Sequence, residues 1–126
     1  MSLLLSNIFK EQLGEQSPFG LEFSHIGLFL NDPLVLFFGV VTTRALQEVR
    51  RKTLASLSVF GEGLLPHFQI DHWTPHCTLA FSVEKAKLAD AVSLCEIQTV
   101  PFNVTVNRIG IIDTPAEIEL SYISLN

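Results

Sequence analysis

The segment from Trp73 to Phe81, which reads WTPHCTLAF, combines residue types that can act on a phosphate group. Side chains alternate between the two faces of a strand, so this segment is predicted to place His76, Thr78 and Ala80 on one face. The intervening Cys77 would then be directed into the core. The α-carbons of His76 and Thr78 would lie about 7 Å apart at a rise of roughly 3.3 Å per residue, which lets both side chains contact one phosphate.

The chemistry open to this pair is the cleavage or formation of a phosphodiester bond. Imidazole titrates near neutral pH and can exchange a proton, and a threonine hydroxyl can donate a hydrogen bond to a phosphate oxygen. A histidine two positions before a threonine also arises by chance, in which case His76 would be a structural residue. The longer string from Pro75 to Phe81, which ends a predicted strand and is followed by a predicted helix, favours the functional interpretation.

The elements that must position this segment follow from the periodicity of apolar residues and from turn-forming residues. In the first half of the chain we predict a helix at Ser2 to Leu13, a hairpin of strands at Leu21 to Leu30 and Leu34 to Val41, and a helix from the cap Thr43 to Ser58. Two extended segments follow, at His67 to Trp73 and His76 to Ser82. The chain then forms a helix at Val83 to Cys95, capped by Ser82, and a final hairpin from Phe102 to Leu125 with a bulge at Gly110. Helices and hairpins in this order indicate an α+β fold.

Length and composition limit the class of protein. The chain has 126 residues, 48% of them hydrophobic, and is predicted to form one domain across residues 1–126. No apolar run reaches the roughly 20 residues that a membrane helix needs, and no secretory signal is recognisable, so we expect a cytoplasmic protein without a membrane partner. The net charge of −5 argues against DNA as a partner, because general affinity for polyanions comes from clustered Lys and Arg.

No metal and no cofactor is predicted. Three histidines lie within ten residues of one another: His67, His72 and His76. Pro75 disfavours the helix that would bring two of them together, and no cysteine pair or acidic cluster completes a zinc site. Cys77 and Cys95 lie inside predicted elements and are interpreted as core thiols. The basic residues from Arg50 to Lys52 are interpreted as part of a solvated helix face, although a local anion-binding patch stays open.

The string Pro75-His76-Cys77-Thr78-Leu79 followed by alanine resembles the second signature of the 2H phosphoesterase superfamily, which includes 2′-5′ RNA ligase-like and cyclic phosphodiesterase-like proteins. A less specific similarity to the family's segments extends over Ser17 to Leu125. It implies an α+β fold with two lobes, antiparallel sheets flanked by helices, and a cleft that holds two His-x-Thr motifs. It also implies that His76 and Thr78 are the catalytic residues carried by this chain.

In that family one histidine acts as the base and the other as the acid, and both threonines bind the phosphate. The first motif would precede the helix at Ser2 to Leu13 and has no counterpart there, so the domain is predicted to be N-terminally reduced and to lack the first His-x-Thr strand. His25-Ile26-Gly27 is the nearest substitute, but glycine replaces the hydroxyl residue. His25 is therefore interpreted as a structural or supporting histidine whose strand can border the cleft.

Two functions of different class stay open. The first is a phosphoesterase-like domain that acts on or binds 2′,3′-cyclic phosphates, 2′,5′-linked nucleotides or RNA ends, with activity reduced or lost. The second is a noncatalytic module for nucleotide binding or protein association. We also expect a homodimer, because the missing first strand would leave the hairpin from Leu21 to Val41 with unpaired edges, and such edges pair with other chains.

Overall fold

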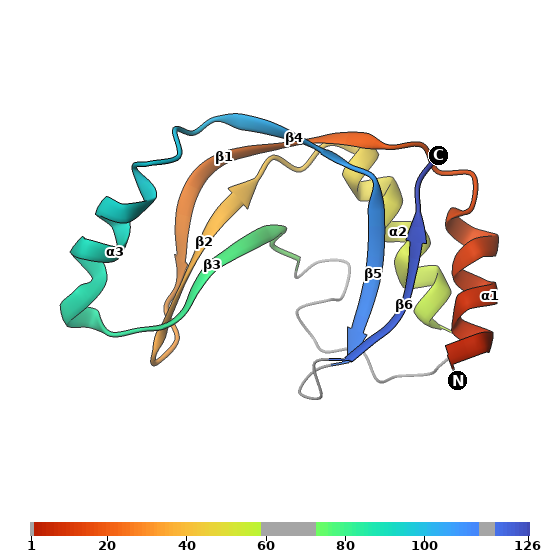
Figure 1. Ribbon diagram of the computed structural model, residues 1–126, viewed down its shortest axis with the longest axis horizontal. Coiled ribbons are helices and arrows are strands. Elements are labelled where there is room, and N and C mark those ends of the chain that lie inside the picture. The colour runs from red at the N-terminus through yellow and green to blue at the C-terminus, as the bar shows by residue number, and fades with distance from the viewer. Residues whose placement is uncertain (1, 59–72, 114–117) are drawn as a thin grey trace. The chain divides into compact units, whose positions relative to one another are not determined.

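The structure of the protein is a computed structural model that describes residues 2–58, 73–113 and 118–126. The described residues form three α-helices and six strands, with one 3-10 turn before the last helix (Figure 1). The helices are α1 (Ser2–Leu13), α2 (Arg44–Leu57) and α3 (Leu88–Cys95), the 3-10 turn is η3 (Lys85–Lys87), and the strands are β1 (Phe19–Phe29), β2 (Leu34–Val40), β3 (His76–Val83), β4 (Phe102–Val106), β5 (Arg108–Asp113) and β6 (Ile118–Ser124). The predicted α+β class is confirmed.

The strands form two sheets, and the chain divides into two compact units. A four-stranded sheet has the order β3-β2-β1-β4, and a two-stranded sheet pairs β5 with β6. The pairs β1–β2, β2–β3 and β5–β6 are antiparallel. The first unit contains α1, α2, β5 and β6, and the second contains β2, β3, α3 and most of β1 and β4. Each unit has its own apolar cluster.

The first unit is built from two amphipathic helices and the β5–β6 hairpin. Leu5, Phe9 and Leu13 recur at helical spacing on α1 and are buried, as the sequence predicts. The core of this unit joins residues of both helices, β6 and the C-terminus: Phe9, Leu13, Val49, Ile123 and Leu125. Helix α2 begins at the predicted cap, since the backbone N–H of Leu46 donates to Oγ1 of Thr43 over 3.2 Å.

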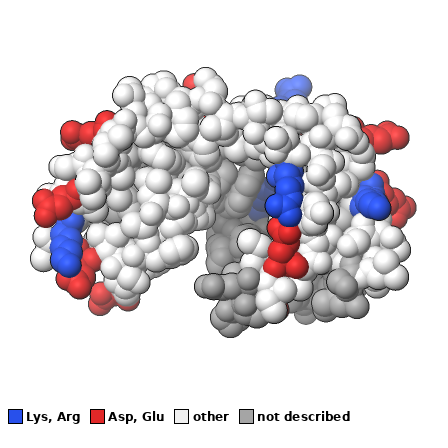
Figure 2. Space-filling view, in the orientation of Figure 1, with Lys and Arg blue, Asp and Glu red and all other residues white. Residues whose placement is uncertain are grey.

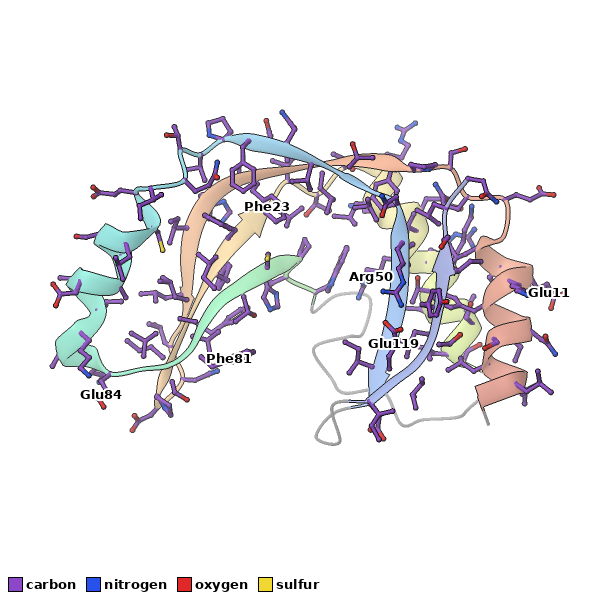
Figure 3. All side chains as sticks on the ribbon, in the orientation of Figure 1. Glu11, Phe23, Arg50, Phe81, Glu84 and Glu119 are labelled. Carbon is purple, nitrogen blue, oxygen red and sulfur yellow. The ribbon has the colours of Figure 1, made fainter. Side chains whose placement is uncertain are left out.

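The second unit is built from the four-stranded sheet and α3. Its buried cluster consists of Leu34, Leu36 and Val83, and apolar residues of β1 and α3 pack against it. A second apolar group lies farther along the same sheet, where the ring of Phe23, labelled in Figure 3, contacts the rings of Phe38 and Phe102. Strand β2 is buried along most of its length because it has a paired strand on either side.

The helix after β3 begins later than predicted. Ser82 is not a helix cap: it lies within β3 with a φ of 59°, and the strand continues to Val83. Leu34 pairs with Val83 while Leu36 pairs with Ala80, so the left-handed residue sits in a bulge that returns Val83 to the core. Helical spacing predicts an inward face of Leu88, Val92 and Cys95. Leu88 and Cys95 do pack inward, together with Ala91, but Val92 is 38% exposed.

The C-terminal segment is not a single hairpin from Phe102 onward. Strand β4 lies beside β1 in the four-stranded sheet, and the hairpin consists of β5 and β6 alone. The register shift in this hairpin falls between Ile111 and Ile112 rather than at Gly110. The prediction that the Leu21 to Val41 hairpin has unpaired edges is also wrong, because β4 pairs with β1 and β3 pairs with β2.

In the part of the chain that the structure describes, no helix combines the length and the apolarity needed to cross a membrane. Some expected features lie outside the described residues: Gly61 and Gly63, which should stop the helix predicted to run to Ser58, the extended segment at residues 67–72, and the turn residues Thr114 and Pro115.

Candidate functional site

The cross-strand register brings two histidines into one row on the four-stranded sheet. His25 of β1 pairs with Gly39 of β2, and Gly39 in turn pairs with His76 of β3. Residues directly opposite one another in antiparallel strands project from the same face. His25, Gly39 and His76, which we call the histidine row, therefore share one face of the sheet.

The next row on the same face contains Thr78. Gly27 of β1 pairs with Phe37 of β2, and Phe37 pairs with Thr78 of β3. We call these three residues the aromatic row, because the ring of Phe37 fills the space above Gly27, with its Cε2 2.6 Å from where a Cβ would stand. His76 and Thr78 thus lie in adjacent rows on one face, and this part of the sequence prediction is confirmed.

An aromatic cluster surrounds the imidazole of His76. Its ring centroid is 4.8 Å from that of Phe29 and 5.4 Å from that of Phe37, in both cases edge-on. The two phenylalanine rings are 4.5 Å apart. Phe37 is buried and Phe29 is half-buried, whereas His76 itself is exposed and Thr78 is half-buried. The imidazole is therefore oriented by apolar contacts and is still accessible to a solute.

Backbone contacts define the protonation of His76. Its Nδ1 lies 2.7 Å from the carbonyl oxygen of Thr74, and a carbonyl oxygen can only accept. Nδ1 therefore carries a proton in both charge states, and Nε2 is the nitrogen that gains or loses one. The start of β3 is held in place because the N–H of Val40 donates to the carbonyl oxygen of Pro75 over 3.3 Å. Nδ1 of His76 is thus held at the start of β3, and no partner of Nε2 is seen among the described residues.

The predicted alternation fails for the neighbours of this pair. Leu36 pairs with Ala80 while Phe37 pairs with Thr78, so a bulge at Leu79 moves Ala80 to the opposite face, where it packs against the buried cluster. Leu79 is 39% exposed and Phe81 74% exposed, so neither is directed into the core.

Cys77 is exposed, which contradicts its predicted burial. It lies opposite Phe38 on an edge strand, at the end of β3 away from the cluster that α3 covers. An edge position without a covering helix leaves its thiol accessible. The other cysteine, Cys95, is partly buried and packs against the cluster of Leu34, Leu36 and Val83.

His25 is closer to the predicted site than sequence reasoning indicated. Its imidazole lies directly over Gly39, where the Nε2 and Cε1 atoms fill the position of a Cβ. Its Nδ1 lies 2.8 Å from Oγ of Ser24, a hydroxyl that can donate or accept. Glycine inside a buried strand is the signal for such a close approach, and Gly39 interrupts an otherwise apolar run.

Electrostatically the site is weakly charged. Strands β1 to β4 contain no Lys or Arg, and their titrating side chains are Glu22, His25, His76 and Cys77. On the face shown in Figure 2, the Lys and Arg side chains are scattered rather than gathered in a patch. A phosphate bound on this face would therefore meet the imidazoles of the histidine row and the hydroxyl of Thr78 rather than a Lys or Arg of these strands.

Two basic residues of α2, Arg51 and Lys52, are already engaged in contacts within the first unit. Arg51 forms a salt bridge with Glu48 on the helix surface, and its guanidinium lowers the pKa of the Glu48 carboxyl. Nζ of Lys52 donates to the side-chain carbonyl of Gln16 over 3.1 Å. Helix α2 is therefore less suited to bind an anion than a cluster of cations without such contacts would be.

Part of the predicted constellation cannot be placed. His67 and His72 lie outside the described residues, and no group of three or more potential metal ligands occurs in the described part of the chain. His72, Trp73 and Thr74 also form a His-x-Thr sequence, which the sequence interpretation passed over. Within it Thr74 lies just before β3 and contributes its carbonyl oxygen to His76.

Comparison with known proteins agrees with this architecture. Residues 5–116 match the family described as the 2′-5′ RNA ligase superfamily, and the chain belongs to this family. The membership confirms the resemblance to 2H phosphoesterases, and the α+β arrangement of antiparallel strands and three helices is consistent with it. No curated protein and no solved structure matched the chain.

Proposed function

We propose that this protein is a phosphoesterase-like domain that acts on 2′,3′-cyclic phosphates or 2′,5′-linked nucleotides at RNA ends, with His76 and Thr78 as its catalytic pair. The family supports the general class of reaction. The observation that carries the assignment to residues is the shared face of His76 and Thr78, with His76 exposed and its Nδ1 held by the carbonyl oxygen of Thr74.

In this mechanism His76 acts as the general base. Its neutral Nε2 takes a proton from water as the water oxygen attacks phosphorus, and it returns that proton to the departing water in the reverse reaction. The hydroxyl of Thr78 donates to a phosphate oxygen, which develops charge as the new bond forms. The aromatic contacts from Phe29 and Phe37 hold the imidazole in orientation and so reduce the entropy lost on reaching the reactive geometry.

The assay is cleavage of nucleoside 2′,3′-cyclic monophosphates and of 2′,5′-linked dinucleotides, followed by chromatographic identification of the products. We expect one of the two possible monophosphates from the cyclic substrate, because one ribose oxygen must be next to the acid. Chelators should leave the rate unchanged, since no metal is part of the mechanism. A purified protein that cleaves neither substrate at high enzyme concentration would contradict the enzymatic proposal.

A noncatalytic nucleotide-binding module is the second candidate. The observation that favours it is the glycine at the hydroxyl position after His25, since His25-Ile26-Gly27 offers no second threonine for the phosphate. Binding of nucleoside 2′- or 3′-monophosphates without turnover of the cyclic or 2′,5′-linked substrates would select this candidate.

Self-association stays a prediction with a different physical basis. The β1–β2 hairpin is paired on both sides, and the edge strands of the four-stranded sheet are β3 and β4. A second copy would therefore pair along one of these strands. Light scattering at micromolar concentration tests this, and a monomeric mass would contradict it.

A further inference from the structure

We propose that the first unit carries a binding site for one nucleotide of a single-stranded nucleic acid, in a hollow between the end of α1 and β6. The base lies against Tyr122 and the phosphodiester at Lys10. This site goes beyond the proposed function, because it belongs to the first unit and involves no reaction at His76. The hollow is open to solvent and measures about 490 Å³, within the range of small-molecule sites. Its lining consists of Lys10, Gly14, Tyr122, Ile123, Ser124 and Asn126.

Tyr122 supplies the aromatic surface of the hollow. Buried and exposed side chains alternate along the end of β6, and Tyr122 is 57% exposed. The Cζ atom of Arg108 lies 3.9 Å from the centroid of the tyrosine ring, in the geometry of a cation–π contact. Arg108 does not line the hollow, so the ring surface that faces the hollow differs from the one that the guanidinium covers.

An ion pair holds the guanidinium in place on the ring. Nη2 of Arg108 donates to Oε1 of Glu119, which is labelled in Figure 3, over 2.6 Å. Gly110 leaves room for this carboxylate, because a Cβ there would lie 2.8 Å from Oε2 of Glu119. The ring of Tyr122 is therefore oriented before a ligand arrives, and a pre-oriented group loses less freedom on binding. Since the charges of the ion pair offset each other, this side of the hollow favours a neutral planar group, and nucleobases of any sequence stack on aromatic rings.

The wall on α1 supplies one cation and little bulk. Lys10 and Gly14 are four residues apart and so lie on the same side of the helix end. The N–H of Gly14 donates to the carbonyl oxygen of Lys10 over 2.7 Å, and a Cβ at Gly14 would meet that same oxygen. Lys10 makes no ion pair in the part of the chain that the structure describes. Its ammonium is therefore available to an anion at the rim of the hollow.

The surrounding charges favour a phosphodiester over a terminal phosphate. Glu11 follows Lys10 directly, with its side chain directed away from β6 (Figure 3), and Glu15 comes shortly after the helix end. A phosphodiester carries one negative charge, which one ammonium balances. A terminal phosphate carries about 1.5–2 charges at pH 7, and the excess would be repelled by the two carboxylates. The hollow is therefore suited to a nucleotide inside a strand.

The test uses Tyr122 as its own reporter. It is the single tyrosine of the chain, so labelling with 3-fluorotyrosine gives one ¹⁹F resonance. The probes are 3′,5′-linked diadenosine monophosphates in the ribo and deoxyribo forms, titrated to about 10 mM, which is tenfold above a Kd of about 1 mM. We expect a saturable shift with at least one of them, a weaker affinity for adenosine, and no shift with dimethyl phosphate. Tyr122 and Lys10 contact groups that RNA and DNA share, so the ratio of the two affinities identifies the strand.

Three variants separate the contributions of base and phosphate. Lys10→Gln should lower the affinity for the dinucleotide about 2- to 5-fold and leave that for adenosine unchanged, as expected for an exposed ion pair. Lys85→Gln is the control, because it makes the same charge change on an exposed lysine of the second unit. Tyr122→Leu, followed through the amide resonance of Ser124, should lower the affinity about 5- to 100-fold. His76→Ala should leave the ¹⁹F titration unchanged.

The inference would be overturned if neither dinucleotide shifted the ¹⁹F resonance, or if Lys10→Gln and Lys85→Gln bound the dinucleotide equally well. A shift that disappeared in His76→Ala would also overturn it, since the binding would then belong to the second unit. None of these results concerns cleavage, so the proposed function would stand or fall separately on the assay of cyclic and 2′,5′-linked substrates.

Discussion

The histidine row and the aromatic row lie side by side on one face, and each contains one glycine, yet the two glycines serve opposite arrangements. In the histidine row the glycine is on β2, and the side chain of His25 leans from β1 over it. In the aromatic row the glycine is on β1, and the ring of Phe37 leans back from β2 over it. The first arrangement extends a titrating group toward His76, and the second closes the sheet surface with a buried ring.

This difference shows why His25-Ile26-Gly27 is not simply a His-x-Thr motif that has lost its hydroxyl. A threonine at position 27 would collide with Phe37, whose ring also contacts His76. The two rows therefore present the hydroxyl of Thr78 and the imidazoles of His25 and His76. A reaction here would depend on acid–base chemistry more than on phosphate binding, because no Lys or Arg occurs in the four strands.

The largest effect is expected from His76→Ala. Removal of a general base lowers kcat by about 10²–10⁴-fold, and the exposed side chain contributes little to the core. Cys77→Ser is the matched control on the same strand, since Cys77 is exposed and should leave the rate unchanged. Steady-state kinetics with a 2′,3′-cyclic nucleotide would measure both. Equal losses in the two variants would indicate that the strand, rather than the imidazole, matters.

A smaller effect is expected from Thr78→Val, which removes the hydroxyl and keeps the shape. A hydrogen bond to a charged group contributes about 1.5–3 kcal/mol, so kcat/KM should fall roughly 10- to 100-fold. Thermal unfolding should change little, because the half-buried side chain keeps its volume. An unchanged kcat/KM would show that the phosphate does not contact the aromatic row.

The two glycines provide a direct comparison of stability. In Gly27→Ala the new methyl meets the buried ring of Phe37, which is also packed against Phe29, so unfolding should become easier by about 1–3 kcal/mol. In Gly39→Ala the three atoms nearest the new methyl all belong to the ring of the exposed His25 side chain, which can rotate away, so the change should stay within about 1 kcal/mol. Urea unfolding measures both. The reverse order of stability would contradict the description of the two rows.

Local sequence rules predicted those features that depend on neighbouring residues. Helical spacing of apolar residues gave α1 with its observed bounds, Thr43 caps α2 as expected, and period-two alternation placed His76 and Thr78 on one face.

The failures came from contacts that are distant in sequence. The bulge that moves Ala80 depends on how β3 pairs with β2, and a one-residue register change reverses the face of every following side chain. The place of His25 beside the site depends on two successive strand pairings through Gly39. The isolated glycine in the apolar run of β2 was the one local sign of that approach.

The most direct test of the central claim is an NMR titration of the labelled protein with a nucleoside 3′-monophosphate. We predict that shift changes centre on His76 and Thr78, extend to the ring of His25, and are weakened by His76→Ala but not by Cys77→Ser. Shift changes that instead cluster on α2, around Arg50, Arg51 and Lys52, would contradict the claim and place the nucleotide on the helix surface of the other unit.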